Sequence, residues 1–369
     1  MMTTKRLLDV CDFQGGTQPP KDEWINDPCE GYVRMLQIRD YSQGDAKFIQ
    51  YVKDTKKLHK CTKDDIMLSR YGYIGQAFIG LEGAYNVALV KVIKKAEIHT
   101  PYLLCYFQSY YFQHFLLSNV GARATIPGFN KDELENALIR IPEMCEQIEI
   151  ASKITKVDEL IGFHKQQLNV LDTLIKSRFI EMFGDPKLNP RKWDMVTIGD
   201  IATDVRYGTS RPATEGGKYP YLRMNNLTYE GYLDLTDLKH IDIPDNEIEK
   251  CVVRNGDVLF NRTNSVELVG KTCVYNLDSD MIIAGYIIRV RIDDRVLPVI
   301  LSSYLNSTVM KEQLRSMAKG AVNQANINAQ ELRSISIYLP PITLQHEFAT
   351  FVEQVDKSKY HGEFTCGME

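Results

Sequence analysis

Residues 142–184 read PEMCEQIEIASKITKVDELIGFHKQQLNVLDTLIKSRFIEMFG, and the rest of the chain is organised around this stretch. Its apolar residues return at alternating steps of four and three, which is the a/d spacing of a coiled coil. The positions are Ile150, Ile154, Val157, Ile161, His164, Leu168, Leu171, Ile175, Arg178 and Met182, of which His164 and Arg178 are not apolar. Pro142 suits a helix start, and Gly184-Asp185-Pro186 suits a helix end.

The stretch therefore predicts one long helix. About 36 helical residues at a rise of 1.5 Å would make a rod of about 54 Å. The alternative is a long helix packed within its own domain. We favour the coiled-coil interpretation because the stretch lies between two similar halves.

The similarity of the halves is visible as a set of repeated phrases, the pattern expected of a tandem duplication. The phrase Gly16-Thr17-Gln18-Pro19-Pro20 returns as Gly208-Thr209-Ser210-Arg211-Pro212. Further pairs are Val33–Gln37 with Leu222–Asn226, Asp65–Arg70 with Asp257–Arg262, Gly75 with Gly270, Gly121-Ala122 with Gly320-Ala321, Ile139–Pro142 with Ile337–Pro340, and Val157-Asp158 with Val355-Asp356. The offset between partners drifts slowly, as insertions and deletions in loops would cause.

Each half is expected to be a globular domain followed by a helix. We predict a first domain at 1–140, a spacer helix at 141–187, a second domain at 188–339 and a second helix at 340–369. Predicted strands are Val87–Ile93, Val258–Asn261, Ile282–Ile292 and Ile335–Leu339, and predicted helices are Pro101–Leu117 and Pro298–Leu314. The fold class is α+β, with two similar domains, each a twisted, β-rich sheet with helices. We expect the aromatic residues of Pro101–Phe115 to form core and not to stack on bases.

Composition excludes several classes of protein. The net charge of −4 does not indicate a generally basic nucleic-acid binder, so any DNA-binding surface must be local. No run of about 18 apolar residues is present, so we expect no membrane span. The eight cysteines have no Cys-x-x-Cys spacing, which is typical of reduced thiols in a cytoplasmic protein.

Catalytic motifs are missing from the sequence. There is no phosphate-binding Gly-x-x-x-x-Gly-Lys-[Ser/Thr] loop and no Asn-Pro-Pro-Tyr motif of the adenine methyltransferase type. Pro244-Asp245 begins a nuclease-like pattern that no Asp/Glu-x-Lys completes within forty residues, and the seven histidines show no metal-ligand spacing. We therefore expect no enzyme activity, no metal and no ATP or S-adenosylmethionine site.

The repeated layout resembles the specificity subunits of type I restriction–modification systems. The resemblance covers nearly the whole chain. It rests on Gly-Thr with a nearby Pro at each domain start, Gly256–Arg262, Gly320–Asn328, Pro340-Pro341-x-x-x-Gln345 and Phe179–Pro186. It implies that each domain is a target recognition domain reading one half of a bipartite double-stranded DNA site. It also implies antiparallel spacer helices that recruit two methyltransferase subunits, as in the family, with restriction and translocase subunits joining through the complex.

Several loops carry side chains suited to DNA. Arg pairs with guanine, Asn and Gln pair with adenine, and cationic groups contact phosphates. The candidates are Thr17, Gln18, Gln37, Arg39, Tyr41, Arg70, Tyr71, Tyr73 and Arg123 in the first half, and Arg206, Tyr207, Ser210, Arg211, Asn225, Asn226, Arg262, Asn264, Asn323, Gln324 and Asn326 in the second. The alternative is that these are ordinary polar turns, with Arg70 and Arg262 in structural ion pairs. Candidates for partner binding are Ile150, Ile154, Val157, Ile161, Leu168, Leu171 and Ile175.

The second helix departs from the family pattern. Residues 341–369 are fewer than residues 142–184, and two glycines after Lys359 are expected to break the helix. We therefore expect a truncated second helix. Two other functions remain open from the sequence alone, namely an inactive copy acting as a protein-interaction scaffold and a self-sufficient DNA-modifying enzyme.

Overall fold

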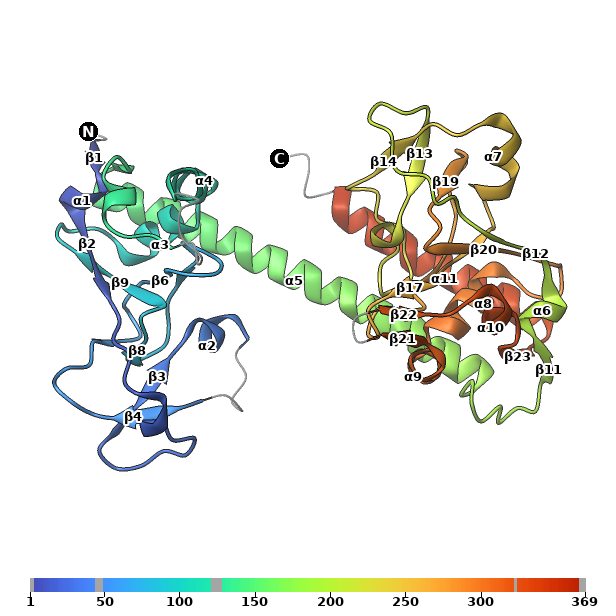
Figure 1. Cartoon of the computed structure of the whole chain (residues 1–369), viewed down its shortest axis with the longest axis horizontal. Coiled ribbons are helices and arrows are strands. Elements are labelled where there is room, and N and C mark those ends of the chain that lie inside the picture. The colour runs from blue at the N-terminus through green and yellow to red at the C-terminus, as the bar shows by residue number, and fades with distance from the viewer. Residues whose placement is uncertain (1–2, 44–48, 121–127, 322–323, 365–369) are drawn as a thin grey trace. The chain divides into compact units, whose positions relative to one another are not determined.

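A computed structural model describes residues 3–43, 49–120, 128–321 and 324–364 of the chain. The chain forms two compact units, Met1–Gly162 and Phe163–Glu369. Helix α5 (Met144–Phe183) belongs to both units, because the division between them falls inside it (Figure 1). The helix predicted for residues 142–184 is thus confirmed.

Three sheets build the first unit. A four-stranded antiparallel sheet has the order β2-β9-β6-β7, a second four-stranded sheet has the order β4-β3-β8-β5, and β1 pairs with β10. The bounds are β1 Thr3–Arg6, β2 Cys11–Gly15, β3 Tyr32–Leu36, β4 Tyr51–Lys53, β5 Lys60–Cys61, β6 Met67–Ser69, β7 Ala77–Phe78, β8 Gly83–Tyr85, β9 Leu89–Lys94 and β10 Leu138–Ile141. The helices of this unit besides α5 are α1 Leu7–Val10, α2 Ile38–Ser42, α3 Thr100–Gln108 and α4 Tyr110–Asn119.

The second unit repeats these three sheets and adds a small one. The orders are β12-β20-β16-β18, β14-β13-β19-β15 and β11-β23, with β17-β22-β21 as the addition. The bounds are β11 Asp194–Thr197, β12 Ala202–Tyr207, β13 Tyr219–Leu222, β14 Lys239–Ile241, β15 Val252–Val253, β16 Val258–Asn261, β17 Thr263–Asn264, β18 Thr272–Val274, β19 Met281–Ile283, β20 Ile287–Ile292, β21 Lys319–Ala321, β22 Gln324–Asn326 and β23 Ser336–Leu339. The helices are α6 Ile198–Ile201, α7 Asp245–Cys251, α8 Pro298–Asn306, α9 Thr308–Met317, α10 Ala329–Arg333 and α11 Ile342–Phe364.

The two units share one strand order and one pairing pattern. In each, the second sheet contains a single parallel pair, β3 with β8 in the first unit and β13 with β19 in the second. The remaining pairs of these sheets are antiparallel. Equal order and equal direction in two sheets confirm the duplication that the repeated phrases predicted.

Two predicted elements are each divided in the structure. The predicted strand Ile282–Ile292 is wrong as one element, because Ala284 and Gly285 leave β19 to pair with Thr209 before β20 begins in another sheet. The predicted helix Pro101–Leu117 is broken at Ser109, whose Oγ accepts a hydrogen bond from Phe112 N (3.3 Å) and caps α4. Ser307 divides α8 from α9 in the same way.

The helices α3 and α4 carry aromatic core. Phe107 and Phe112 are fully buried, and their rings meet edge to face at 4.9 Å. The expectation that this aromatic segment is core is confirmed for these residues. Tyr110 and Tyr111 are exceptions, since they are 81% and 55% exposed.

Helix α11 packs antiparallel to the last turns of α5 within the second unit (Figure 1). The Phe348 ring lies 5.5 Å from the rings of both Phe179 and Phe183, and Lys359 Nζ lies 2.6 Å from Asp172 Oδ1. The predicted helix break after Lys359 is wrong, because α11 continues to Phe364. A single glycine inside a helix costs only about 1 kcal/mol, which neighbouring turns tolerate.

Candidate nucleic-acid interface

The repeated Gly-Thr phrase has a steric cause. A Cβ atom on Gly16 would lie 2.0 Å from Asn86 O, and one on Gly208 would lie 2.1 Å from Ile283 O. We call β2-β9-β6-β7 and β12-β20-β16-β18 the central sheets of the two units. Glycine lets the chain that leaves β2 or β12 lie directly against the neighbouring sheet. The following threonines are held by their backbone, with Thr209 N donating to Ile283 O at 2.9 Å. The motif therefore fixes the path of the loop that carries the first candidate residues.

Arg262 follows β16 and is held on three sides. Its Cζ lies 4.8 Å from the centroid of the Tyr207 ring, its Nη2 donates to Asn326 Oδ1 (3.0 Å), and its Nη1 lies 3.5 Å from Gly285 O. Tyr207 is fixed in turn, because its hydroxyl accepts a hydrogen bond from Ala329 N (2.8 Å). The guanidinium thus ties the strand end to β22.

Arg70 holds the matching place in the first unit, after β6. Its Nε donates to Phe129 O (3.0 Å), its Nη2 donates to Asn130 Oδ1, and its Cζ lies 5.3 Å from the Tyr71 ring centroid. In both units, therefore, an arginine after the central strand bonds an asparagine amide and stacks on a tyrosine. The partners that the structure describes for both arginines are uncharged oxygens and a tyrosine ring, and not the carboxylates that an ion pair would require.

Other candidate side chains are engaged inside their own unit. Arg39 Nη2 donates to Gln50 Oε1 (2.7 Å), and Gln37 Nε2 donates to the same oxygen (3.3 Å). The Tyr41 ring stacks on Phe78 at 4.9 Å. Arg211 makes a two-pronged contact with Glu247 (3.1 and 2.7 Å). These side chains would have to exchange protein contacts for DNA contacts.

Asn226 is the one candidate that is fully buried among those described with side chains. Its Oδ1 accepts a hydrogen bond from Arg223 N (2.8 Å), and its Nδ2 donates to Asp234 O (2.7 Å). Both ends of the amide are satisfied within the domain. Its neighbour Asn225, by contrast, is exposed.

The remaining candidates are distributed over the surface of their units. The exposed ones are Gln18, Tyr73, Arg206, Tyr207, Ser210 and Asn225, and the half-buried ones are Thr17, Tyr71, Asn264 and Asn326. Gln324 contributes its backbone to β22. Arg123 and Asn323 lie outside the described residues. Asn130 was missed from the sequence, although its place opposite Arg70 matches that of Asn326 opposite Arg262.

Cations near the central sheet of the second unit are neutralised or perturbed. Arg289 is buried and donates to Asp204 Oδ2 (2.5 Å). Burial alone would raise the pKa of Asp204, but hydrogen bonds from Arg206 and Arg289 hold it below its usual value. Burial, with neighbouring cations, lowers the pKa of Lys311 to about 7. Little of this positive charge is available at the surface.

The described residues contain no group of three or more His, Cys, Asp or Glu side chains placed to hold a metal ion. No helix in the described part of the chain is long and apolar enough to cross a membrane.

Comparison with known proteins identifies the architecture. A family model described as the type I restriction modification DNA specificity domain matches residues 1–173 and 190–361. The EcoKI specificity subunit of Escherichia coli K12 is 22% identical over 92% of this chain and 79% of its own length. The MjaVIII specificity subunit of Methanocaldococcus jannaschii is 23% identical over 95% of this chain and 85% of its own length.

A solved structure has the same fold. The S subunit of a type I system from M. genitalium superposes with a TM-score of 0.54 at 14% identity, covering 99% of this chain and 92% of the other. The family model matches each unit once, in agreement with the duplicated sheets. The chain therefore belongs to the family of type I restriction–modification DNA specificity subunits, which recognise DNA together with other subunits and are not enzymes themselves.

Proposed function

We propose that each recognition domain reads one half of an asymmetric, bipartite DNA target. The observation that carries this proposal is the equal strand order of the two units within one chain. Two copies of one scaffold with different loop sequences would present two different sets of base-reading side chains. The target would then have two specified halves with an unread gap between them.

We assign the reading role to exposed side chains around the end of the central sheet. In the second domain the candidates are Tyr207, Ser210 and Asn225, and in the first they are Gln18 and Tyr73. An exposed amide can form two hydrogen bonds with adenine, and a tyrosine can contact the backbone or a base. Arg206 is also exposed, but its Nε donates to Asp204 (2.8 Å), so a phosphate contact would compete with this bond.

Arg70 and Arg262 are assigned a positioning role. In both domains the arginine donates to an asparagine Oδ1 and lies against a tyrosine ring, although the two tyrosines hold different places in the chain. The targets of the two domains differ under this proposal, so a base-reading residue would not be expected to keep one kind of partner in both. Each guanidinium bonds an asparagine near the C-terminal end of its domain, Asn130 or Asn326. Loss of the contact would leave the segment that carries this asparagine free to move relative to the central strand.

The helices are assigned the roles of spacing the domains and recruiting two methyltransferase subunits, through which restriction and translocase subunits would join. Ile154, Val157 and Ile161 on α5 are 39, 54 and 41% exposed, which supports a partner surface there. Ile175 instead packs against the core of the second unit. Leu168 and Leu171 are half-buried. A cytoplasmic place of action follows from this role.

The proposal is tested with the chain assembled with its methyltransferase subunits. Modification mapping of host DNA gives the target, and gel-shift titration then compares the intact duplex with duplexes scrambled in one half. Asn326→Ala should reduce affinity about tenfold and abolish discrimination at one half only, because Arg262, which packs against the Tyr207 ring, loses a hydrogen-bond partner. Asn130→Ala should do the same at the other half.

Asn255→Ala, an exposed position elsewhere on the second domain, is the matched control and should leave both halves unchanged. Equal loss at both halves from Asn326→Ala or Asn130→Ala would contradict the division of labour between the domains. Binding of the assembled complex that ignores both halves would contradict DNA recognition itself.

A further inference from the structure

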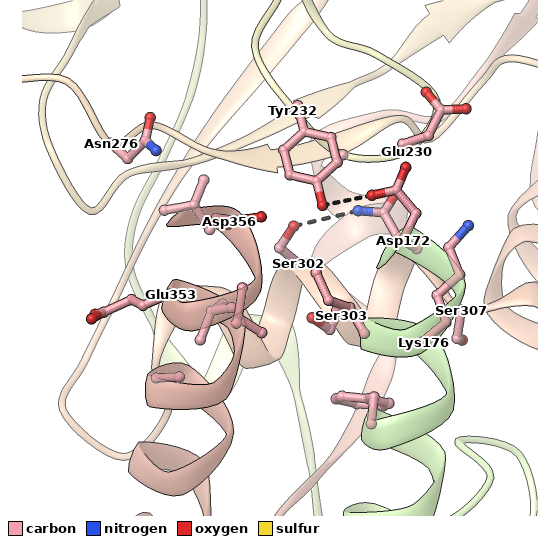
Figure 2. Close-up of a pocket in the computed structure, with 18 of the residues that line it drawn as sticks. Asp172, Lys176, Glu230, Tyr232, Asn276, Ser302, Ser303, Ser307, Glu353 and Asp356 are labelled. Carbon is pink, nitrogen blue, oxygen red and sulfur yellow. Dashed lines mark hydrogen bonds between the residues drawn. The ribbon is translucent and has the colours of Figure 1, made fainter. Parts of the chain in front are cut away.

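A cavity of about 560 Å³ lies within the second unit, between the helix pair and the recognition domain (Figure 2). Asp172 and Lys176 reach it from α5, and Glu353 and Asp356 reach it from α11. Helix α8, the segment 230–235, residues 274–277 and the start of α9 also line it. Its volume lies in the range of about 300–1,000 Å³ that is typical of sites for small organic ligands.

The body of the cavity is apolar. Ile175 and Phe179 of α5, Val352 of α11 and Val299 of α8 line it. Leu233 adds a side chain from the recognition domain. Removal of the ligand's apolar surface from water at these walls would favour binding, against the entropic cost of association.

The charge of the cavity is negative. Five carboxylates line it, from Asp172, Asp185, Glu230, Glu353 and Asp356. Among the lining residues that the structure describes, Lys176 is the one cation. A ligand in this cavity would therefore meet an excess of negative charge.

The ammonium of Lys359 forms ion pairs with two of these carboxylates. Lys359 Nζ lies 2.6 Å from Asp172 Oδ1 and 3.2 Å from Asp356 Oδ1. The Tyr232 hydroxyl donates to Asp172 Oδ1 (3.0 Å), which joins the recognition domain to this pair (Figure 2). Burial raises the pKa of Asp356, Lys359 lowers it in part, and Asp172 adds to the rise. The carboxylate of Asp356 is thus undercompensated by its neighbours.

We propose that this cavity binds a small organic cation, an amine carried on an aliphatic or aromatic body. The apolar walls would take the body, and the ammonium would lie against Asp356 and its acidic neighbours. Such a ligand touches both α11 and the recognition domain, so it would stabilise their packing by mass action. This proposal does not depend on DNA recognition.

The test uses the full chain and three probes that share a phenylethyl body: 2-phenylethylamine, 2-phenylethanol and 3-phenylpropanoate. Calorimetry should show the amine binding at least tenfold more tightly than the alcohol, and the carboxylate binding more weakly than either. Asp356→Asn should cut the preference for amine over alcohol at least fivefold. Glu230→Gln removes a second carboxylate that lines the cavity and should also cut the preference for amine over alcohol at least fivefold.

Two further variants test whether the ligand binds in this cavity. Val352→Trp fills the cavity and should weaken amine and alcohol alike by at least tenfold, with the helical circular dichroism retained. Glu347→Gln removes an exposed carboxylate of the same helix that does not line the cavity, and should change nothing. The proposal is overturned if the amine shows no advantage over the other two probes, or if Asp356→Asn and Glu230→Gln both leave that advantage intact.

Discussion

Phe348→Ala should remove the main contact between α11 and α5. The side chain is fully buried, and its ring meets the rings of Phe179 and Phe183 at 5.5 Å each. A buried Phe→Ala substitution costs about 3–5 kcal/mol from lost transfer energy and the cavity left behind. That is a large share of a domain stability of about 5–15 kcal/mol. The unfolding free energy of the second unit should fall by about this amount.

The assay follows the second unit alone. The chain has two tryptophans, and Trp193 Nε1 donates to Phe183 O (3.2 Å) beside the substituted ring. In a Trp24→Phe background, tryptophan fluorescence during urea unfolding therefore reports only this unit. Phe163→Ala, 66% exposed on α5, is the matched control and should shift stability by less than about 0.5 kcal/mol. A loss below about 1 kcal/mol for Phe348→Ala would refute the helix packing.

Three further results are expected. Gly208→Ala should lower the melting temperature and abolish recognition of one half-site, because its Cβ would collide with Ile283 O; intact recognition of both halves would count against the assigned loop path. Burial lowers the pKa of Lys311 from its ordinary value of 10.5 to about 7 in the folded chain. Between pH 7 and pH 9 the unfolded chain therefore binds more protons than the folded chain, and the free energy of unfolding rises by about 2 kcal/mol. Lys311→Met should remove that gain, as the difference between urea titrations at the two pH values measures. Ile161→Asp should keep the circular dichroism but lose co-purification with methyltransferase subunits, and retained recruitment would exclude this surface.

The sequence predicts the long helix and the duplication because both depend on spacing. Periodic apolar residues indicate a helix whatever packs against it, and repeated phrases indicate repeated structure. Val258–Asn261 was predicted with its observed bounds, since a short β-branched and aromatic run between turn residues leaves little choice.

What the sequence did not predict depends on contacts between distant residues. Ser109 reads as an ordinary helix residue until its hydroxyl is seen to cap α4. Ala284 and Gly285 leave their strand because Thr209, some 75 residues earlier, pairs with them. Asn130 became a site residue only through its bond to Arg70.

The cavity also depends on contacts between residues that are distant in the sequence. Asp172 and Asp356 are ordinary polar positions on two helices in the sequence, and antiparallel packing brings both to Lys359. Hydrophobic spacing alone specifies which face of a helix is apolar, but not which residues of a partner helix lie opposite it.

The central claim is that the two domains read the two halves of one target independently. Its most direct test exchanges residues 190–339 for the matching domain of another family member and maps the modified DNA sequence in cells that carry the complete system. The predicted result is a target in which one half is new and the other half is that of the unaltered protein. A change in both halves, or in neither, would contradict the claim.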